Sequence, residues 1–366
     1  MSEALQIIKP EVRRLRAYSL RPDRARIKLN QNENAWDTPA EVKEEVLRRV
    51  AISAWSRYPD FISEGLHRRL AQHCGWTPEG IIAGNGSNEL IQALMMATLS
   101  EGKRVLISEP TFALYRQLAT ILGAEVLSVP LTNELQYDVA ALKAAIQSAA
   151  PAVTVVCSPN NPTGCLLNRR DLASLLEVAK GLVVVDEAYF EFANETAVPL
   201  LEQYPNLIVL RTFSKAMALA GLRLGYLLAA PELVREISKA VLPYNLNFIS
   251  QTAAEVALEM YQSKLKSLVS LICAERERLF MQLEQIEGLK AIPSRANFIL
   301  IRSAIAPQRI YQQLLRRNIL VRDVSSYPML QDCFRISVGT PEENDELVSA
   351  LKEIFAGKEQ GIRAQS

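Results

Sequence analysis

Short apolar segments alternate with helical patterns between residues 80 and 226. Five continuous apolar segments of strand length lie at residues 81–83, 105–108, 153–157, 182–185 and 207–210. Because these segments do not alternate with polar residues, they are typical of strands buried on both faces of a mainly parallel sheet. Leu172, Leu175 and Leu176 recur at helical spacing between two of them. The pattern predicts an α/β fold, with a mixed, mainly parallel sheet sandwiched by helices.

The pattern changes at both ends of this region. Residues 251–286 read as one long helix, and three strands follow in a smaller α+β unit at residues 298–301, 320–322 and 334–338. Near the N-terminus, Thr38, Pro39 and Glu41 predict a helix start, with Thr38 as the N-cap. We therefore divide the chain into an N-terminal arm (1–35), a large unit (36–245) and a small C-terminal unit (246–366), which part of the N-terminal segment joins.

Composition narrows the possible functions. The chain has 366 residues and a formal net charge of +1, so it lacks the basic field that a nucleic-acid backbone requires. No apolar run reaches the length of a membrane span, and no signal pattern opens the sequence. The five cysteines are scattered and form no CxxC pair, which is typical of reduced thiols in the cytoplasm. The sequence contains no zinc-binding pattern and no GxSxG, so we predict no metal site.

Polar residues directly follow the predicted strands, where ligands bind in open parallel sheets. Asp186 follows residues 182–185, and a carboxylate at the edge of an apolar core needs a partner. One interpretation is an ion pair or a helix cap. The other is a salt bridge to the protonated pyridine nitrogen of pyridoxal 5'-phosphate (PLP). Tyr189 three residues later and Lys215 downstream favour the second interpretation.

Lys215 lies just past the strand at residues 207–210, between the apolar Phe213 and Met217. It is either an exposed lysine or a Schiff-base lysine, whose pKa burial lowers. Arg223 follows eight residues later, and it is either a structural arginine or a phosphate ligand together with Thr212 and Ser214.

Four further segments each have a structural and a functional interpretation. The loop at residues 84–87 precedes a helix and could bind an anion, although this signal alone is weak. Residues 160–164 form a turn, and an asparagine there could donate to a ring oxygen of the cofactor. Phe112 packs in the core or stacks on the ring. Arg335, within an apolar strand, pairs with a buried glutamate or grips a substrate carboxylate.

Taken together, these segments resemble the fold-type I PLP-dependent aminotransferases of class II, and within them the histidinol-phosphate aminotransferases. The resemblance runs from residue 29 to residue 340, and its most specific segments are residues 211–216, 220–223, 160–164 and 186–189. Two departures stand out. Asn88 replaces the usual aspartate, and Ala35 and Trp36 stand where Asn-Pro-Tyr-Gly is frequent.

The resemblance implies a role for each site residue. Lys215 would hold the cofactor covalently, and Asp186 would hold its pyridine nitrogen. Asn161 and Tyr189 would contact its ring oxygen, and Phe112 would lie over the ring. The residues implied around its phosphate are Gly86, Ser87, Asn88, Thr212, Ser214 and Arg223. Tyr58 would reach the partner subunit's cofactor, which implies a homodimer with shared active sites. The implied substrate ligands are Arg335 for the carboxylate of glutamate, Arg322 and Tyr18 for the phosphate of a phosphorylated keto acceptor, and Asn32.

The implied reaction interconverts histidinol phosphate and 2-oxoglutarate with imidazole-acetol phosphate and glutamate, a step of histidine biosynthesis. Two alternatives stay open: an aromatic amino acid aminotransferase, and a phosphothreonine decarboxylase of the cobalamin pathway. A non-enzymatic PLP-binding regulator is remote, because this chain has neither the length nor the basic patch for an added DNA-binding domain.

Overall fold

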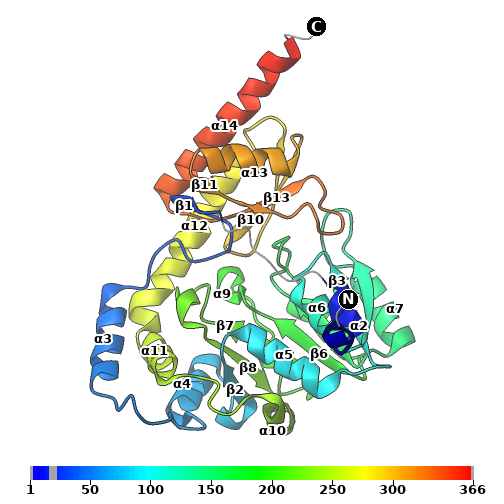
Figure 1. The fold of residues 1–366 in the computed structure, drawn as a ribbon, viewed down its shortest axis with the longest axis vertical. Helices are drawn as coiled ribbons and strands as arrows, with labels where there is room; N and C mark the ends of the chain where they lie inside the picture. The colour runs from blue at the N-terminus through cyan, green and yellow to red at the C-terminus, as the bar shows by residue number, and fades with distance from the viewer. Residues whose placement is uncertain (1–2, 16–22, 364–366) are drawn as a thin grey trace.

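The computed structural model describes residues 3–15 and 23–363. A seven-stranded sheet forms its centre (Figure 1). In spatial order the strands are β2 (Ile81–Gly84), β8 (Gly225–Ala229), β7 (Leu207–Thr212), β6 (Leu182–Asp186), β5 (Val153–Cys157), β3 (Arg104–Glu109) and β4 (Glu125–Pro130). β8 pairs antiparallel with both neighbours, and the other pairs are parallel. The predicted α/β fold class with a mixed, mainly parallel sheet is confirmed.

Helices cover both faces of this sheet, which explains why its strands are apolar throughout. One core lies between the sheet and the helices α5 (Ser87–Thr98), α6 (Leu114–Ile121) and α10 (Pro231–Ile237). The opposite face packs against α4 (Glu64–Cys74), α7 (Val139–Ala149) and α8 (Arg169–Leu176). Successive strand residues alternate between the two cores, so Val155 faces the first and Val156 the second.

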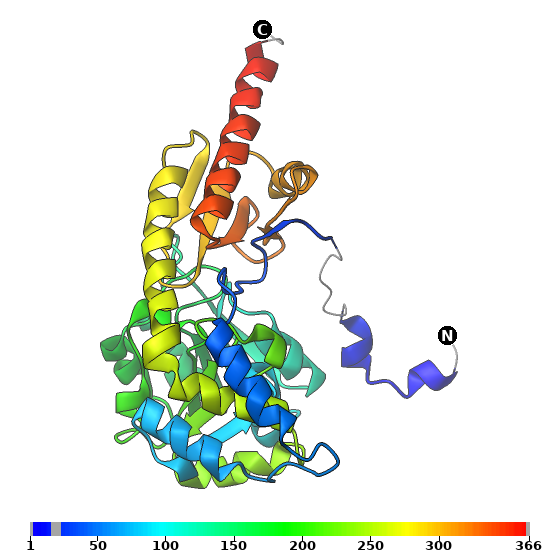
Figure 2. The same cartoon turned by 90° about the vertical axis from the view of Figure 1, so that its left-hand side faces the viewer.

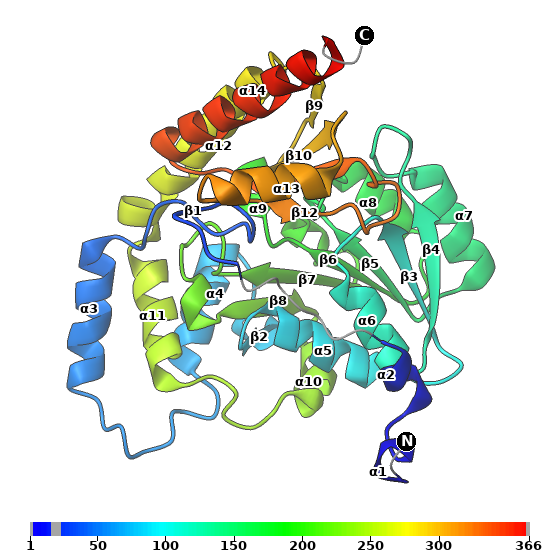
Figure 3. The ribbon, with the colours of Figure 1, turned by 45° about the horizontal axis from the view of Figure 1, so that its top comes forward.

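A smaller antiparallel sheet lies beyond the carboxyl ends of the large one (Figure 3). Its order is β12 (Arg322–Asp323), β13 (Cys333–Ser337), β10 (Phe298–Ser303) and β9 (Leu289–Ile292). The helices α12 (Lys266–Leu283), α13 (Pro307–Arg316) and α14 (Pro341–Arg363) accompany it. β1 (Ile27–Lys28) pairs in parallel with β11 (Ile319–Leu320), so the N-terminal segment joins this part of the molecule (Figure 2). None of the helices in residues 3–15 and 23–363 is long and apolar enough to cross a membrane.

The remaining elements are short, except for two helices beside the large sheet. The helices are α1 (Glu3–Gln6), α2 (Pro10–Arg14), α3 (Ala40–Ala51), α9 (Phe190–Ala193) and α11 (Phe248–Glu259). Single turns of 3₁₀-helix are η1 (Pro78–Gly80), η2 (Val198–Leu200), η3 (Ala220–Leu222) and η4 (Ser238–Ala240).

Three predicted elements are wrong in detail. The long helix expected over residues 251–286 is interrupted, because the π-helical turn η5 (Tyr261–Leu265) separates α11 from α12. The strand expected over residues 320–322 is divided into β11 and β12, which pair with different strands. Thr38 is not the N-cap of α3, which begins one residue later at Ala40. Its hydroxyl instead donates a 2.8 Å hydrogen bond to the carbonyl of Ala218.

Candidate active site

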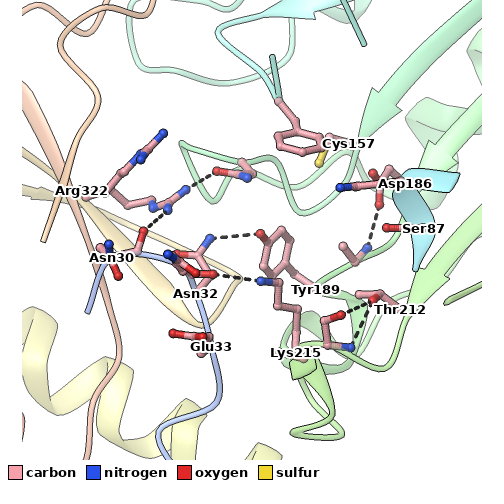
Figure 4. Close-up of a pocket in the computed structure, with 18 of the residues that line it drawn as sticks. Asn30, Asn32, Glu33, Ser87, Cys157, Asp186, Tyr189, Thr212, Lys215 and Arg322 are labelled. Atoms are coloured by element: carbon pink, nitrogen blue, oxygen red, sulfur yellow. Dashed lines mark hydrogen bonds between the residues drawn. The ribbon is translucent and has the colours of Figure 1, made fainter. Parts of the chain in front are cut away.

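A cavity of about 490 Å³ lies at the carboxyl ends of the central parallel strands, under β12 and β13 (Figure 4). Residues 30–33 of the N-terminal segment close one side. The predicted site residues that line it are Asn32, Ser87, Asn88, Phe112, Asn161, Asp186, Tyr189, Thr212, Ser214, Lys215, Arg223, Arg322 and Arg335. The topology thus brings together residues as far apart in the sequence as Asn32 and Arg335.

Asp186 ends β6 and is 3% exposed. Its carboxylate accepts a 2.6 Å hydrogen bond from the Tyr115 hydroxyl and a 3.1 Å bond from the backbone N–H of Ala188. Both donors are neutral, and burial raises the pKa of Asp186 above its usual range. A buried carboxylate that has only neutral hydrogen-bond donors is stabilised by a positive group that enters the cavity.

Lys215 lies opposite Asp186 in the same cavity (Figure 4). Its Nζ donates a 3.0 Å hydrogen bond to the backbone carbonyl of Gln31. Burial, followed by the positive charge of Arg335, lowers the pKa of Lys215 to about 8. In a substantial fraction of the molecules, Lys215 is therefore a neutral, nucleophilic amine near physiological pH.

We expect Lys215 of the apo-protein to react with an amine-selective reagent with a pH midpoint near 8. An ordinary lysine titrates at about 10.4. Between these two values the unfolded chain binds more protons than the folded one, so this group's contribution to stability rises with pH. Mass spectrometry of the labelled peptide at a series of pH values gives the midpoint. Arg335→Met should raise it, and a wild-type midpoint near 10.4 would contradict the assignment.

The start of α5 forms an anion cradle. Gly86, with a φ of 81°, precedes Ser87, the first helical residue, whose N–H belongs to the positive end of the helix. The positive φ of Gly86 disfavours any residue with a Cβ atom, and such a Cβ would lie 2.7 Å from Nη2 of Arg223. Arg223 Nη1 donates to Ser214 Oγ at 3.3 Å, and the hydroxyls of Ser214 and Thr212 are 2.9 Å apart. These donors from three separate segments suit a phosphate group.

Two arginines face each other on the opposite wall. Arg322 of β12 and Arg335 of β13 are direct cross-strand partners, and both line the cavity. Like charges at such positions repel, which an anion between them relieves. Arg335 also donates through Nη1 to Asn161 Oδ1 and through Nη2 to the carbonyl of Asn30, at 3.0 Å for the latter.

The sequence did not reveal Tyr115, the hydrogen-bond partner of Asp186. It is fully buried in α6, and a tyrosine among the apolar residues of a covering helix was the only available signal. The sequence also did not reveal the buried ion pair of Arg211 with Glu187, at 3.0 Å. These residues directly neighbour Thr212 and Asp186, so the pair links the ends of β7 and β6 behind the cavity.

Two predicted residues lie elsewhere. Tyr58 is 82% exposed and stacks on Tyr244 at 4.6 Å between ring centroids, and it does not line this cavity of its own chain. Tyr18 lies outside the described residues. Among the residues that the structure describes, no group of three or more His, Cys, Asp and Glu side chains could hold a metal ion.

The donor set fits PLP. The cradle between Gly86 and Arg223 suits its phosphate, the buried carboxylate of Asp186 suits a protonated ring nitrogen, and Lys215 supplies an amine in the same cavity. The fold and this cavity define a fold-type I PLP-dependent enzyme. The model of the family "Aminotransferase class I and II" matches residues 24–351, and the chain belongs to this family.

Comparison with individual proteins narrows the similarity. The chain is 39% identical to the histidinol-phosphate aminotransferase of Chlorobaculum tepidum, over 95% of this chain and 100% of the relative. It is also 39% identical to the enzyme of that name from Thermoanaerobacter pseudethanolicus, over 95% and 99%. Among solved structures, histidinol-phosphate aminotransferase from Sinorhizobium meliloti in complex with pyridoxal-5'-phosphate superposes with a TM-score of 0.84, 26% identity, and coverage of 95% of this chain and 97% of that chain.

Proposed function

We propose that this chain is a histidinol-phosphate aminotransferase, which interconverts histidinol phosphate and 2-oxoglutarate with imidazole-acetol phosphate and glutamate. The observation that carries the proposal is the pair Arg322 and Arg335, which faces the same cavity as Lys215. One substrate brings a carboxylate beside its amino group and the other a phosphate ester, and guanidinium groups bind both anions. The near full-length similarity to enzymes of that name supports the assignment.

The cofactor, when bound, delocalises the electron pair left on the substrate α-carbon. The chain's own residues do the rest. Asp186 keeps a proton on the ring nitrogen, because its buried carboxylate is stabilised by that positive charge. Lys215 Nζ, whose pKa burial lowers, accepts the proton that leaves the substrate α-carbon. Arg335 orients the α-carboxylate so that the bond to this proton faces the lysine.

An assay of the purified holoenzyme tests the proposal. Glutamate should be the amino donor, and imidazole-acetol phosphate should be converted with a far higher kcat/KM than phenylpyruvate or 4-hydroxyphenylpyruvate. Efficient use of the aromatic keto acids alone would favour the aromatic amino acid aminotransferase. Release of carbon dioxide from phosphothreonine without transamination would favour the decarboxylase.

Arg322→Ala should lower kcat/KM for the phosphorylated acceptor by about ten- to a hundredfold, because a charge-assisted hydrogen bond to phosphate contributes about 1.5–3 kcal/mol. The half-reaction with glutamate should change little, since Arg335 retains the carboxylate. Single-turnover kinetics with each substrate measure the two effects separately. Arg309→Ala, a substitution on the neighbouring helix α13, is the control. Equal losses with both substrates would contradict a phosphate-specific role.

We also propose that the enzyme is a homodimer with shared sites. Tyr58 is the residue by which each subunit reaches its partner's cofactor phosphate. An exposed apolar surface around Tyr58 supports this, because Trp55, Phe61 and Leu242 are each more than 60% exposed. Contiguous apolar patches of this kind mark protein interfaces.

We further propose a cytoplasmic location and the division into an arm (1–35), a large unit (36–245) and a small unit (246–366).

Tyr58→Phe should weaken the affinity of the dimer for PLP by about tenfold, because one hydrogen bond to a charged group is lost. Fluorescence titration of the apo-protein gives the affinity, and sedimentation equilibrium gives the oligomeric state. Tyr204→Phe, which lies away from both the cavity and this surface, serves as the control. A fully active monomer would exclude shared sites.

A further inference from the structure

Two side chains on one wall of the cavity have their hydrogen-bond direction fixed by neighbours. Asn161 is the first. Its Oδ1 accepts from Nη1 of Arg335, and a guanidinium has donors only. The amide oxygen must therefore face Arg335, and the amide NH₂ is the group that Asn161 presents on its other side.

Tyr189 is the second, and a chain of three hydrogen bonds sets its direction. The backbone N–H of Asn32 donates to Ser337 Oγ at 2.8 Å. The Ser337 hydroxyl proton is then directed to Asn32 Oδ1, at 3.3 Å. Asn32 Nδ2 in turn donates to the Tyr189 hydroxyl at 3.0 Å (Figure 4). Tyr189 is the acceptor in this bond, so its own proton points to another acceptor.

The surroundings hold this chain in place. Asn32 has a φ of 54°, a left-handed conformation that asparagine tolerates better than most residues. Asn297 Nδ2 donates to the carbonyls of Asn32 and Glu33, at 3.0 and 3.2 Å. Ser337 and Asn32 are 2% and 1% exposed, so water does not compete for their hydrogen bonds. Asn32, Glu33 and Tyr189 line the main cavity, whereas Ser337 and Asn297 do not.

We propose that Ser337 is a positioning residue that acts through Asn32 to make the Tyr189 hydroxyl a donor toward the ring oxygen of PLP. The proposal rests on the proposed function for the identity of the cofactor. Tyr189 and Asn161 then both present protons to one oxygen, which favours the ionised phenolate over the neutral phenol. The preference of the site for this oxygen would then depend on a serine that does not line the cavity.

The test compares two ligands of the apo-protein: PLP and 3-deoxypyridoxal 5'-phosphate, which lacks the ring oxygen. Wild-type protein should bind PLP about ten- to a hundredfold more tightly than the deoxy compound. In Ser337→Ala the Asn32 amide loses its fixed direction, and we expect this ratio to fall about three- to tenfold. Affinity for the deoxy compound should stay the same, because this compound has no ring oxygen to accept the Tyr189 proton. A purely structural defect would instead weaken the binding of both compounds.

Three further variants complete the design. Ser337→Thr keeps the hydroxyl that donates to Asn32 Oδ1 and should restore the ratio. Asn32→Asp offers Tyr189 an acceptor in place of a donor, so the tyrosine proton turns toward the aspartate and away from the ring oxygen. The preference for PLP over the deoxy compound should then be lost. Ser303→Ala removes another buried serine, at the end of β10, where its hydroxyl donates to the carbonyl of Ile305, and should leave the ratio unchanged.

The outcomes separate this inference from the function on which it rests. A wild-type ratio in a folded Ser337→Ala variant would overturn the role of Ser337 while leaving a PLP enzyme, whatever the result for Asn32→Asp. Equal weakening of both ligands would assign Ser337 a structural role and overturn the proposal as well. A wild-type protein that takes up neither compound would overturn the proposed function together with the inference. Thermal unfolding of each variant identifies any that does not fold, and Asn32→Asp then decides.

Discussion

Lys215→Ala is expected to reduce multiple-turnover transamination by at least about ten-thousandfold, the upper range for the loss of a positioned general base. The variant loses both the base that accepts the substrate proton and the amine that attaches the cofactor. Initial rates with glutamate as donor measure the first loss. Mass spectrometry after borohydride reduction measures the second, because wild-type protein gains one pyridoxyl group on the peptide that contains Lys215 and the variant gains none.

Two comparisons make this result specific. Lys239→Ala removes an exposed lysine whose partner is the exposed Glu236, and it should behave like wild type. Added methylamine should restore part of the Lys215→Ala activity, because a small amine can occupy the vacated space and accept the proton. Normal turnover by the variant without added amine would refute the role of Lys215.

Asp186→Asn should lower kcat by about a hundred- to a thousandfold, the range for loss of one preorganised electrostatic group. The amide cannot stabilise a protonated ring nitrogen, although its oxygen can still accept the bond from Tyr115. The apo-protein should not lose stability, since the substitution removes a buried charge whose pKa is raised by burial. Stopped-flow rates of the glutamate half-reaction and thermal unfolding of the apo-protein measure the two effects.

Asp332→Asn, a half-exposed aspartate paired with Arg302, is the matched control. A second variant, Tyr115→Phe, should lower the rate much less, because it removes a neutral donor and keeps the carboxylate. If Asp186→Asn retains the wild-type rate, the carboxylate does not act on the ring nitrogen.

The local pattern of the sequence predicted five of the seven strands of the large sheet, without β4 and β8, and the family resemblance supplied several of the residues that line the cavity. A continuous apolar segment followed at once by Asp186 places this carboxylate at a strand end without knowledge of the rest of the fold. Lys215 could be predicted for a similar reason, since it lies shortly after the end of β7. The parallel topology then brings these strand ends to one edge.

Contacts between distant segments could not be predicted in this way. Tyr115 lies 71 positions before its partner Asp186, and its hydroxyl is needed only because that carboxylate is buried. Ser337 and Asn32 are 305 positions apart, and their bond depends on how β13 packs beside the N-terminal segment. The position of Thr38 shows a different limit. Its tertiary partner, the carbonyl of Ala218, competes with the local capping pattern and prevails.

The π-helical turn η5 has a mechanical consequence. Its extra residue rotates everything that follows by about 100° relative to an unbroken α-helix. α11 therefore presents its apolar side to α3 and α4, while α12 turns Leu279 and Leu283 toward the core beside α14. Deletion of one residue within η5 would restore a regular helix and swing these leucines away from that core. A single inserted residue therefore sets the angle between the buried face of α11 and the buried face of α12.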